Sequence, residues 1–328
     1  MPKSTIWKHA LALAVALACG SGVPAHGAGF EWGRTSNFEN APLELAIWYP
    51  SRATPREESI GPISQTVASG AAIDGDRLPL IAISHGTGGS SLGHRDTAIA
   101  LADAGFVVVA VMHAGDNYRD RSASFASRNF AARARQISWV LDHMTREWAH
   151  RGRIDPARIG ILGHSAGGAT ALLLVGGRMD MRRLVAFCRD NPGDWGCRGA
   201  RENNVVDDGP GTIVGRDTRI KAAATAATAV GTAFAAEDLV DVKTPLQIWV
   251  ATADTIAPDS RSIGSRLSGP RDEHVVANAG HFAFLTPCEP ALAAMGPEIC
   301  ADPPGFDRPA FLREFHKSTI AFFRANLK

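Results

Sequence analysis

A serine flanked by small residues is the strongest chemical signal in this sequence. Ser165 lies in the segment Gly-His-Ser-Ala-Gly at 163–167, after an apolar run at 158–162 and before a helical pattern at 166–175. In a G-x-S-x-G turn between a strand and a helix, the glycines let the chain reverse tightly and the serine hydroxyl is held exposed. We therefore predict that Ser165 is a nucleophile and not an incidental residue of an ordinary strand–helix turn.

A serine hydroxyl needs a base within hydrogen-bond reach, and a histidine usually fills this role. Three histidines follow Ser165 in the chain. His281 comes after an expected strand at 273–277, on a loop of small residues, whereas His274 lies inside that strand and His316 lies in a helical pattern. We therefore predict His281 as the base.

The base in turn needs an acid that orients its ring, and after a G-x-S-x-G turn this acid precedes the histidine in the chain. Asp254 directly follows an expected strand at 245–251. Asp259 is the nearest competitor, but it follows a proline and is expected at a helix start, where an acid is favoured anyway. The preceding strand, at 219–226, ends without an acid. Asp254 is the predicted orienting acid.

Attack on a carbonyl also requires two backbone N–H groups that stabilise the developing oxyanion. The N–H of Ala166, at the start of the helix, is one candidate. The loop Ser-His-Gly-Thr-Gly-Gly at 84–89 supplies the other, and we predict the N–H of Thr87. A phosphate-binding role is disfavoured because the spacings of known phosphate loops are absent. His85 and His164 are expected to brace these turns by hydrogen bonds.

These residues need a scaffold that brings the ends of several strands together. Short apolar runs alternate with longer helical patterns, which indicates an α/β fold with a mostly parallel sheet flanked by helices. Polar residues at 51–77 indicate a loop. Strands are expected at 43–49, 79–84, 106–112, 159–162, 219–226, 245–251 and 273–277, and helices at 95–104, 129–145, 166–175 and 309–325.

Residues 176–218 break this alternation, and we interpret them as an insertion into one α/β domain that spans 28–328. The insertion would act as a lid, as a surface for a partner or as a loop without regular structure. His113, Asp116, Tyr118 and Trp195 are candidates to line a substrate pocket, although each would serve equally well as a surface or packing residue.

The first 27 residues have the pattern of a signal peptide. Lys3 and Lys8 precede an apolar run at 10–20, and small residues follow it. The run is too short to span a bilayer. A lipid anchor on Cys19 is a less favoured alternative because alanine stands where leucine is expected three positions earlier. We therefore predict export to the periplasm or the medium, with a buried N-terminal helix as the alternative.

Export makes disulfides plausible for the four cysteines that remain after cleavage. Four cysteines allow three connectivities. We favour the two local pairs, Cys188 with Cys197 and Cys288 with Cys300, over four free thiols, because each pair would tie a loop rich in glycine and proline. A metal site is not indicated because neither CxxC nor HExxH spacing occurs. No cofactor is implied.

Charge and composition narrow the class of partner. The formal net charge is +1, and loss of Lys3 and Lys8 with the signal peptide would make it −1. This balance gives no reason to bind nucleic acid or an anionic membrane. A composition of 45% hydrophobic and 20% charged residues suits a soluble globular protein. The expected partner is a small-molecule ester, and the oligomeric state is left open.

Taken together, these motifs resemble the α/β-hydrolase superfamily. Within it, the chain resembles exported serine hydrolases related to dienelactone hydrolases and platelet-activating-factor acetylhydrolases. The segments that carry the resemblance are LAIWYP (45–50), ISHGTGG (83–89), GHSAGG (163–168), ATADTIAP (251–258) and AGHFAF (279–284). The resemblance implies an α/β-hydrolase fold and cleavage of carboxylic esters through an acyl-enzyme.

Two departures limit the substrate that this resemblance implies. True dienelactone hydrolases use cysteine where this chain has Ser165, and the acetylhydrolases place the acid one strand earlier than Asp254. Other activities considered within the same fold are those of a lipase, a polyester hydrolase and an acyl-peptide hydrolase. A non-catalytic binding protein that keeps the fold is the alternative from a different class.

Overall fold

The computed structural model describes residues 27–202 and 212–328. The predicted signal peptide lies outside the described residues except for Gly27, which is the first residue of strand β1. Among the described residues, no helix is both long and apolar enough to cross a membrane.

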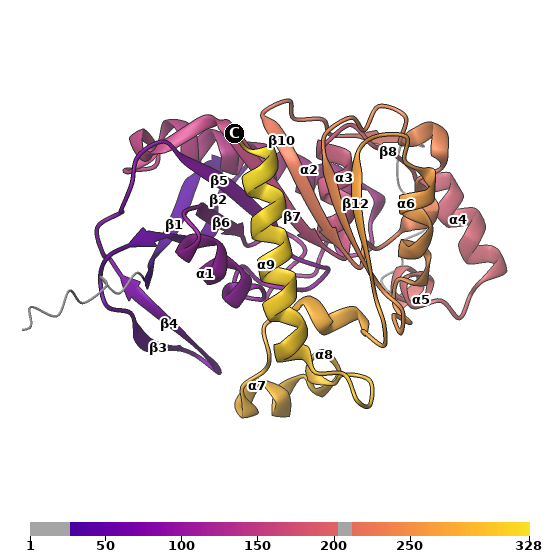
Figure 1. Cartoon of the computed structure of the whole chain (residues 1–328). Helices are drawn as coiled ribbons and strands as arrows, with labels where there is room; N and C mark the ends of the chain where they lie inside the picture. Colours follow the sequence, from indigo (N-terminus) through magenta and orange to yellow (C-terminus); the bar gives the residue numbers. More distant parts are fainter. Residues whose placement is uncertain (1–26, 203–211) are drawn as a thin grey trace, which may run out of the picture.

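A ten-stranded sheet forms the centre of the molecule, with the order β12-β11-β10-β7-β5-β6-β2-β1-β4-β3 (Figure 1). The six strands from β12 to β6 are parallel, β2 and β1 follow as antiparallel neighbours, and β4 and β3 form a hairpin beyond them. The strands are β1 (Gly27–Phe38), β2 (Ala41–Ser51), β3 (Arg56–Ile60), β4 (Ile63–Ser69), β5 (Leu78–Ser84), β6 (Val107–Val111), β7 (Ile154–His164), β10 (Ile220–Ala226), β11 (Leu246–Ala251) and β12 (Arg271–Val276).

Helices cover both faces of this sheet and form two apolar cores with it. Helices α2 (Ser127–Arg146) and α3 (Ala166–Leu174) pack on one face. Helices α1 (Arg95–Asp103) and α9 (Arg308–Asn326) pack on the other face. These helices lie close to the predicted ranges, and the α/β prediction with a mostly parallel sheet is confirmed.

The prediction of a loop over 51–77 is wrong, because this segment contains the β3–β4 hairpin. The hairpin is at the edge of the sheet, where charged side chains such as Glu57 face solvent and hide the usual strand pattern. Only a few apolar residues, among them Ile60, Ile63 and Val67, reach the core. Strand β1 was not predicted either.

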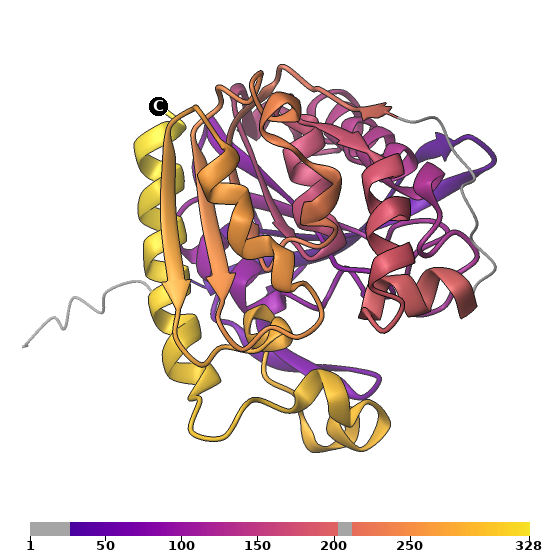
Figure 2. The ribbon, with the colours of Figure 1, turned by 90° about the vertical axis from the view of Figure 1, so that its right-hand side faces the viewer.

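The region 176–218, predicted as an insertion, contains regular structure. It has helices α4 (Met181–Asp190) and α5 (Trp195–Glu202) and a small two-stranded sheet of β8 (Arg178–Asp180) and β9 (Thr212–Val214). Both helices are short, and most of their residues are at least partly exposed. Figure 2 shows them on the opposite side of the molecule from α9.

Short helical segments connect the remaining elements. They are η1 (Arg151–Arg153), η2 (Gly231–Ala233), η3 (Ala236–Asp238), η4 (Pro258–Ser262), α6 (Ile263–Arg266), η5 (His281–Phe284), α7 (Pro290–Met295) and α8 (Pro297–Cys300). Two disulfides stabilise this periphery. Cys188–Cys197 joins α4 to α5, and Cys288–Cys300 closes the segment that contains α7 and α8. These are the two local pairs that the sequence favoured.

Candidate active site

The turn between β7 and α3 holds Ser165 in an unusual backbone conformation, with φ +56° and ψ −120°. A non-glycine residue in this region of φ is strained. Two glycines make the tight turn possible. A Cβ at Gly163 would lie 2.1 Å from the carbonyl oxygen of Gly167, and a Cβ at Gly167 would lie 1.8 Å from that of Ser84. The small residues of the motif are therefore a steric requirement of the turn.

The structure brings Ser165, His281 and Asp254 into one chain of hydrogen bonds. The Oγ of Ser165 lies 2.9 Å from Nε2 of His281, and Nδ1 of His281 lies 2.8 Å from Oδ2 of Asp254. Each residue follows the carboxyl end of a strand. Because these strands are parallel, their carboxyl ends lie at the same edge of the sheet, and the three residues are brought close together there. The geometry suits a ring that donates from Nδ1 to the carboxylate and accepts from the serine hydroxyl at Nε2.

Asp254 is held in its ionised form. Its side chain is fully buried, which raises the pKa of the carboxyl group. The bond from His281 and two backbone N–H groups, from Ile256 and Ala257 at 2.8 Å each, outweigh this effect, and the net pKa lies below its ordinary value. Asp259, the sequence competitor, instead accepts hydrogen bonds from Thr232 and lies away from the His281 ring nitrogens.

The loop after β5 lies directly against the nucleophile. A Cβ at Gly86 would be 3.0 Å from Cβ of Ser165. Thr87, Ser165 and Ala166 all line the same pocket. Among the described residues, neither the N–H of Thr87 nor that of Ala166 has a hydrogen-bond partner. Within the described part of the chain, two backbone donors without a partner are therefore present in the pocket that Ser165 lines.

Behind this loop lies a buried ion pair between Asp116 and Arg133. Nη1 of Arg133 is 2.7 Å from Oδ2 of Asp116, and both side chains are 0% exposed. Asp116 also accepts from the N–H of Gly88 at 3.0 Å, from Oγ of Ser124 at 2.6 Å and from Nδ2 of Asn129 at 2.7 Å. Burial raises the pKa of the Asp116 carboxyl. Arg133 and these hydrogen-bond donors lower the pKa by more than burial raises it, so the net pKa lies below its ordinary value.

His113 does not line the pocket, contrary to its selection as a substrate-binding candidate. It is fully buried behind the loop, where both ring nitrogens form hydrogen bonds of 2.8 Å: Nε2 with Oγ of Ser84 and Nδ1 with Oε1 of Gln136. His85 braces the loop as expected, because its Nδ1 donates to the carbonyl of Gly86 at 2.7 Å and its Nε2 accepts from the N–H of His113. Burial lowers the pKa of His85 to about 3, so this ring is neutral.

Two further histidines hold the segment that carries His281. Nε2 of His164 donates to the carbonyl of His281 at 2.9 Å, and Nδ1 of His94 donates to the carbonyl of Phe284 at 3.0 Å. Both rings are buried, and burial lowers the pKa of each. His164 thus braces the site as predicted, while the contribution of His94 was not anticipated.

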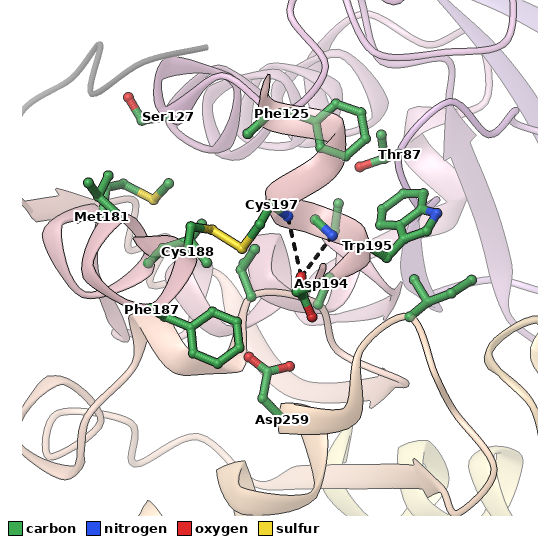
Figure 3. A pocket seen from close by; sticks show the side chains of 18 of the residues that line it. Thr87, Phe125, Ser127, Met181, Phe187, Cys188, Asp194, Trp195, Cys197 and Asp259 are labelled. Atoms are coloured by element: carbon green, nitrogen blue, oxygen red, sulfur yellow. Dashed lines mark hydrogen bonds between the residues drawn. A yellow bond between two sulfur atoms is a disulfide. The ribbon is translucent and has the colours of Figure 1, made fainter. Parts of the chain in front are cut away.

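Ser165 lines a cavity of about 260 Å³. Figure 3 shows side chains that surround this cavity. Its walls are largely apolar and come from the start of α2, from α4 and α5, and from the loops at 229–230 and 256–259. Trp195 lines it as predicted, and the centroid of its ring lies 5.3 Å from the centroid of the Phe125 ring. The carboxylates of Asp194 and Asp259 interrupt this apolar surface. In Figure 3 the carboxylate of Asp259 points toward Asp194.

Asp116, a candidate for the pocket wall, instead lies buried behind the loop, and its contacts with Arg133 and the loop were not predicted. One signal was present, because Arg133 lies three residues after Phe130 and four before Ile137, on the face of α2 that is buried. A charged residue on a buried helical face requires a partner. Among the described residues, no group of three or more histidine, cysteine or acidic side chains is arranged to hold a metal ion.

Comparison with known proteins supports the superfamily resemblance. The model of the family described as platelet-activating factor acetylhydrolase, isoform II, matches residues 58–147, a range that includes the loop at 84–89 and ends before Ser165. A search of curated protein sequences gives no significant match.

Similar solved structures cover nearly the whole chain. A ferulic acid esterase from Streptomyces cinnamoneus is 18% identical, with a TM-score of 0.60 over 94% of this chain and 92% of that one. A dienelactone hydrolase from Anabaena variabilis is 13% identical, with a TM-score of 0.52 over 91% of this chain and 99% of that one. The chain therefore has the α/β-hydrolase fold, as predicted.

Proposed function

We propose that this protein is a serine hydrolase that cleaves carboxylic esters through an acyl-enzyme. Ser165 is the nucleophile, His281 the base and Asp254 the acid that orients the base. The observation that carries the proposal is the unbroken series of contacts, 2.9 Å and 2.8 Å long, that ends at the wall of an apolar pocket. The ester-cleaving proteins among the similar structures support the same reaction class.

In the first half-reaction, Oγ of Ser165 attacks the carbonyl carbon while its proton passes to Nε2 of His281. Asp254 stabilises the imidazolium that forms. The N–H groups of Thr87 and Ala166 donate to the oxyanion of the tetrahedral intermediate. When this intermediate collapses, the C–O bond to the alcohol breaks and His281 returns the proton to the leaving oxygen.

In the second half-reaction, water replaces the alcohol. His281 takes a proton from the water as it attacks the acyl carbon, and a second oxyanion forms between the N–H groups of Thr87 and Ala166. Collapse of this intermediate releases the carboxylic acid and returns the proton to Oγ of Ser165. Both steps use the same three side chains and no cofactor.

The pocket favours an ester with one compact apolar group. A cavity of about 260 Å³ is slightly smaller than most ligand sites, which commonly span ~300–1,000 Å³. Short and medium acyl chains therefore fit it better than the long chains that a lipase takes. A polyester hydrolase or an acyl-peptide hydrolase would share the machinery around Ser165 and would differ in the groups that the pocket accepts.

The test is an assay of the mature protein on p-nitrophenyl esters from C2 to C12, beside a Ser165→Ala variant. We expect activity on short and medium chains that is lost in the variant. Labelling of the wild type by a fluorophosphonate, absent in the variant, checks the nucleophile without assuming a substrate. A protein that neither turns over esters nor labels would be a non-catalytic binding protein, and the proposal would fail.

We further propose that the protein is exported and that residues 1–27 are removed. Two disulfides support this proposal because such bonds persist in oxidising compartments. The check is the N-terminal sequence of the protein recovered from periplasm and medium. An N-terminus at or close to residue 26 or 28 is expected, whereas an intact N-terminus in the cytoplasm would contradict export.

A further inference from the structure

We propose that the buried pair Asp116–Arg133 is a positioning device for the oxyanion loop, residues 85–89. The pair acts through the loop backbone and does not touch the substrate. This inference rests on the proposed function, because it assumes that the N–H of Thr87 stabilises the oxyanion.

The contacts of the pair bracket Thr87. Asp116 accepts from the N–H of Gly88 at 3.0 Å, one residue after Thr87. Arg133 donates through Nη2 to the carbonyl oxygen of His85, two residues before it. The loop is thus held from behind on both sides of Thr87, and the N–H of Thr87 itself is left for the pocket.

Other contacts of the loop follow the same arrangement. Tyr118 donates its N–H to the carbonyl of Gly89 at 3.0 Å, and the N–H of Gly89 donates to the carbonyl of Gly86 at 3.0 Å. Asp116 and Tyr118 lie on the segment after β6, whereas Arg133 lies on α2. The loop is therefore tied to two separate elements of the scaffold, and a shift of either would move Thr87.

Fold stability alone does not explain such a pair. Replacing a buried ion pair by apolar residues of similar volume is often neutral or stabilising, because desolvation of both charges opposes their attraction. Charge-assisted hydrogen bonds are, however, shorter and more directional than contacts between apolar side chains. A catalytic donor needs this accuracy, since a displacement of ~1 Å can lower the rate ~100-fold.

The decisive variant is Asp116→Asn, which keeps the shape of the side chain and one acceptor for Gly88. Its amide nitrogen cannot accept the bonds that Arg133 and Asn129 donate to Oδ2, so the Gly88 side of the loop loses its link to α2 and only the bond from Arg133 to the carbonyl of His85 remains. We expect kcat to fall ~10- to 100-fold with KM within about threefold of the wild type. The Ki of a trifluoromethyl ketone, which forms a tetrahedral oxyanion on Ser165, should rise by the same factor as kcat/KM falls.

Asp217→Asn is the matched control. The side chain of Asp217 is 8% exposed, and it also pairs with an arginine, the partly exposed Arg219, through bonds of 2.9 and 2.6 Å. It precedes β10, at the end of the sheet away from Ser165. We expect a comparable loss of thermal stability but unchanged kcat and Ki. An equal loss of kcat in this control would show a general effect of destabilisation and would overturn the inference.

Arg133→Lys keeps the test open if Asp116→Asn does not fold. Lysine retains the buried charge next to Asp116 but has a single nitrogen, which cannot serve both the carboxylate and the carbonyl of His85. We expect a folded protein with lowered kcat and weakened ketone binding. Wild-type kcat and Ki in this variant would refute the positioning role. Failure of the wild type itself to label with a fluorophosphonate would instead refute the proposed function.

Discussion

The structure surrounds Ser165 with two regions that are held together differently. The polar side consists of the hydrogen-bonded groups that position His281 and the loop 85–89, chiefly Asp254, His164, Asp116 and Arg133. The apolar side is the pocket wall formed by α4 and α5. Directional bonds fix atoms to within fractions of an ångström, whereas apolar packing fixes mainly the volume that is available.

We expect the residues of the polar side to determine the reaction rate and those of the apolar side to determine the preference among esters. Changes on the polar side should lower kcat on all esters alike, because they disturb groups that act in every turnover. Changes on the apolar side should alter the preference among esters, because they change the space offered to the substrate. The predictions below test this separation.

The largest effect is expected for Asp254→Asn on the polar side. An amide at this position favours the wrong tautomer of His281 and cannot stabilise its cation, which in comparable triads lowers kcat ~10⁴-fold. We expect a loss of ~10³- to 10⁴-fold, with the ratio of rates on C2 and C6 esters unchanged. Asp259→Asn is the control and should keep kcat on C2 within a few-fold. The reverse result would identify Asp259 as the orienting acid.

The next effect concerns the two disulfides, which have similar loop lengths. One variant replaces Cys188 and Cys197 by serine, and a second replaces Cys288 and Cys300 by serine. We expect each variant to have a free energy of unfolding that is lower by ~2–3 kcal/mol. Only the first pair lies in the wall of the pocket, so only its loss should change the chain-length profile. Urea unfolding and p-nitrophenyl ester assays measure the two quantities. A changed profile in the second variant would contradict the separation.

A smaller effect is expected from filling the pocket. Ala200 on α5 lines the cavity, and Ala200→Phe should lower kcat/KM on C6 and C8 esters about 10- to 100-fold. The C2 ester should be affected less than threefold because its acyl group is small. Ala186→Phe, on the exposed face of α4, is the matched control. Equal losses on all chain lengths would show that the apolar side also governs rate.

The smallest effect is the pH dependence of stability that one buried histidine contributes. Burial holds the pKa of His85 at about 3 and lowers those of His94, His113 and His164. The unfolded chain binds protons at these sites below about pH 6.5, and the native state does not, so stability falls as the pH drops. Each site contributes up to ~1.4 kcal/mol per pH unit.

Urea unfolding at pH 6.5, 5.5 and 4.5 measures this slope. Asp254, whose pKa is depressed, contributes stability above about pH 3.8 that is lost only at lower pH. Burial raises the pKa of Asp259, so this carboxyl lowers the stability as the pH rises and opposes the slope from the histidines. The difference in slope between the wild type and a histidine variant therefore isolates that histidine. Replacing His113 by Gln should reduce the slope by one proton, whatever its effect on total stability. A flat profile in the wild type would contradict neutral buried rings.

The sequence by itself located the residues proposed to react. Ser165 and Asp254 each follow an apolar run that ends in a turn, and His281 follows a more polar strand that ends in the turn at 278–280. Such patterns depend on neighbours in the chain. Parallel strands end at the same edge of a sheet, so recognising the strands was sufficient to expect these residues to meet. The β3–β4 hairpin escaped recognition because it lies at the edge of the sheet, where charged residues of β3 face solvent and only a few apolar residues reach the core.

Only the tertiary structure decided what surrounds these residues. Asp116 and Gly88 are 28 residues apart in sequence, and Arg133 and His85 are 48 apart, so no local pattern links them. The pocket wall likewise depends on how α4 and α5 dock, through contacts such as the ring of Phe125 against Trp195. Local sequence determines strands and turns because these depend on interactions between residues that are close in the chain. Buried ion pairs and cavities arise only when distant segments pack together.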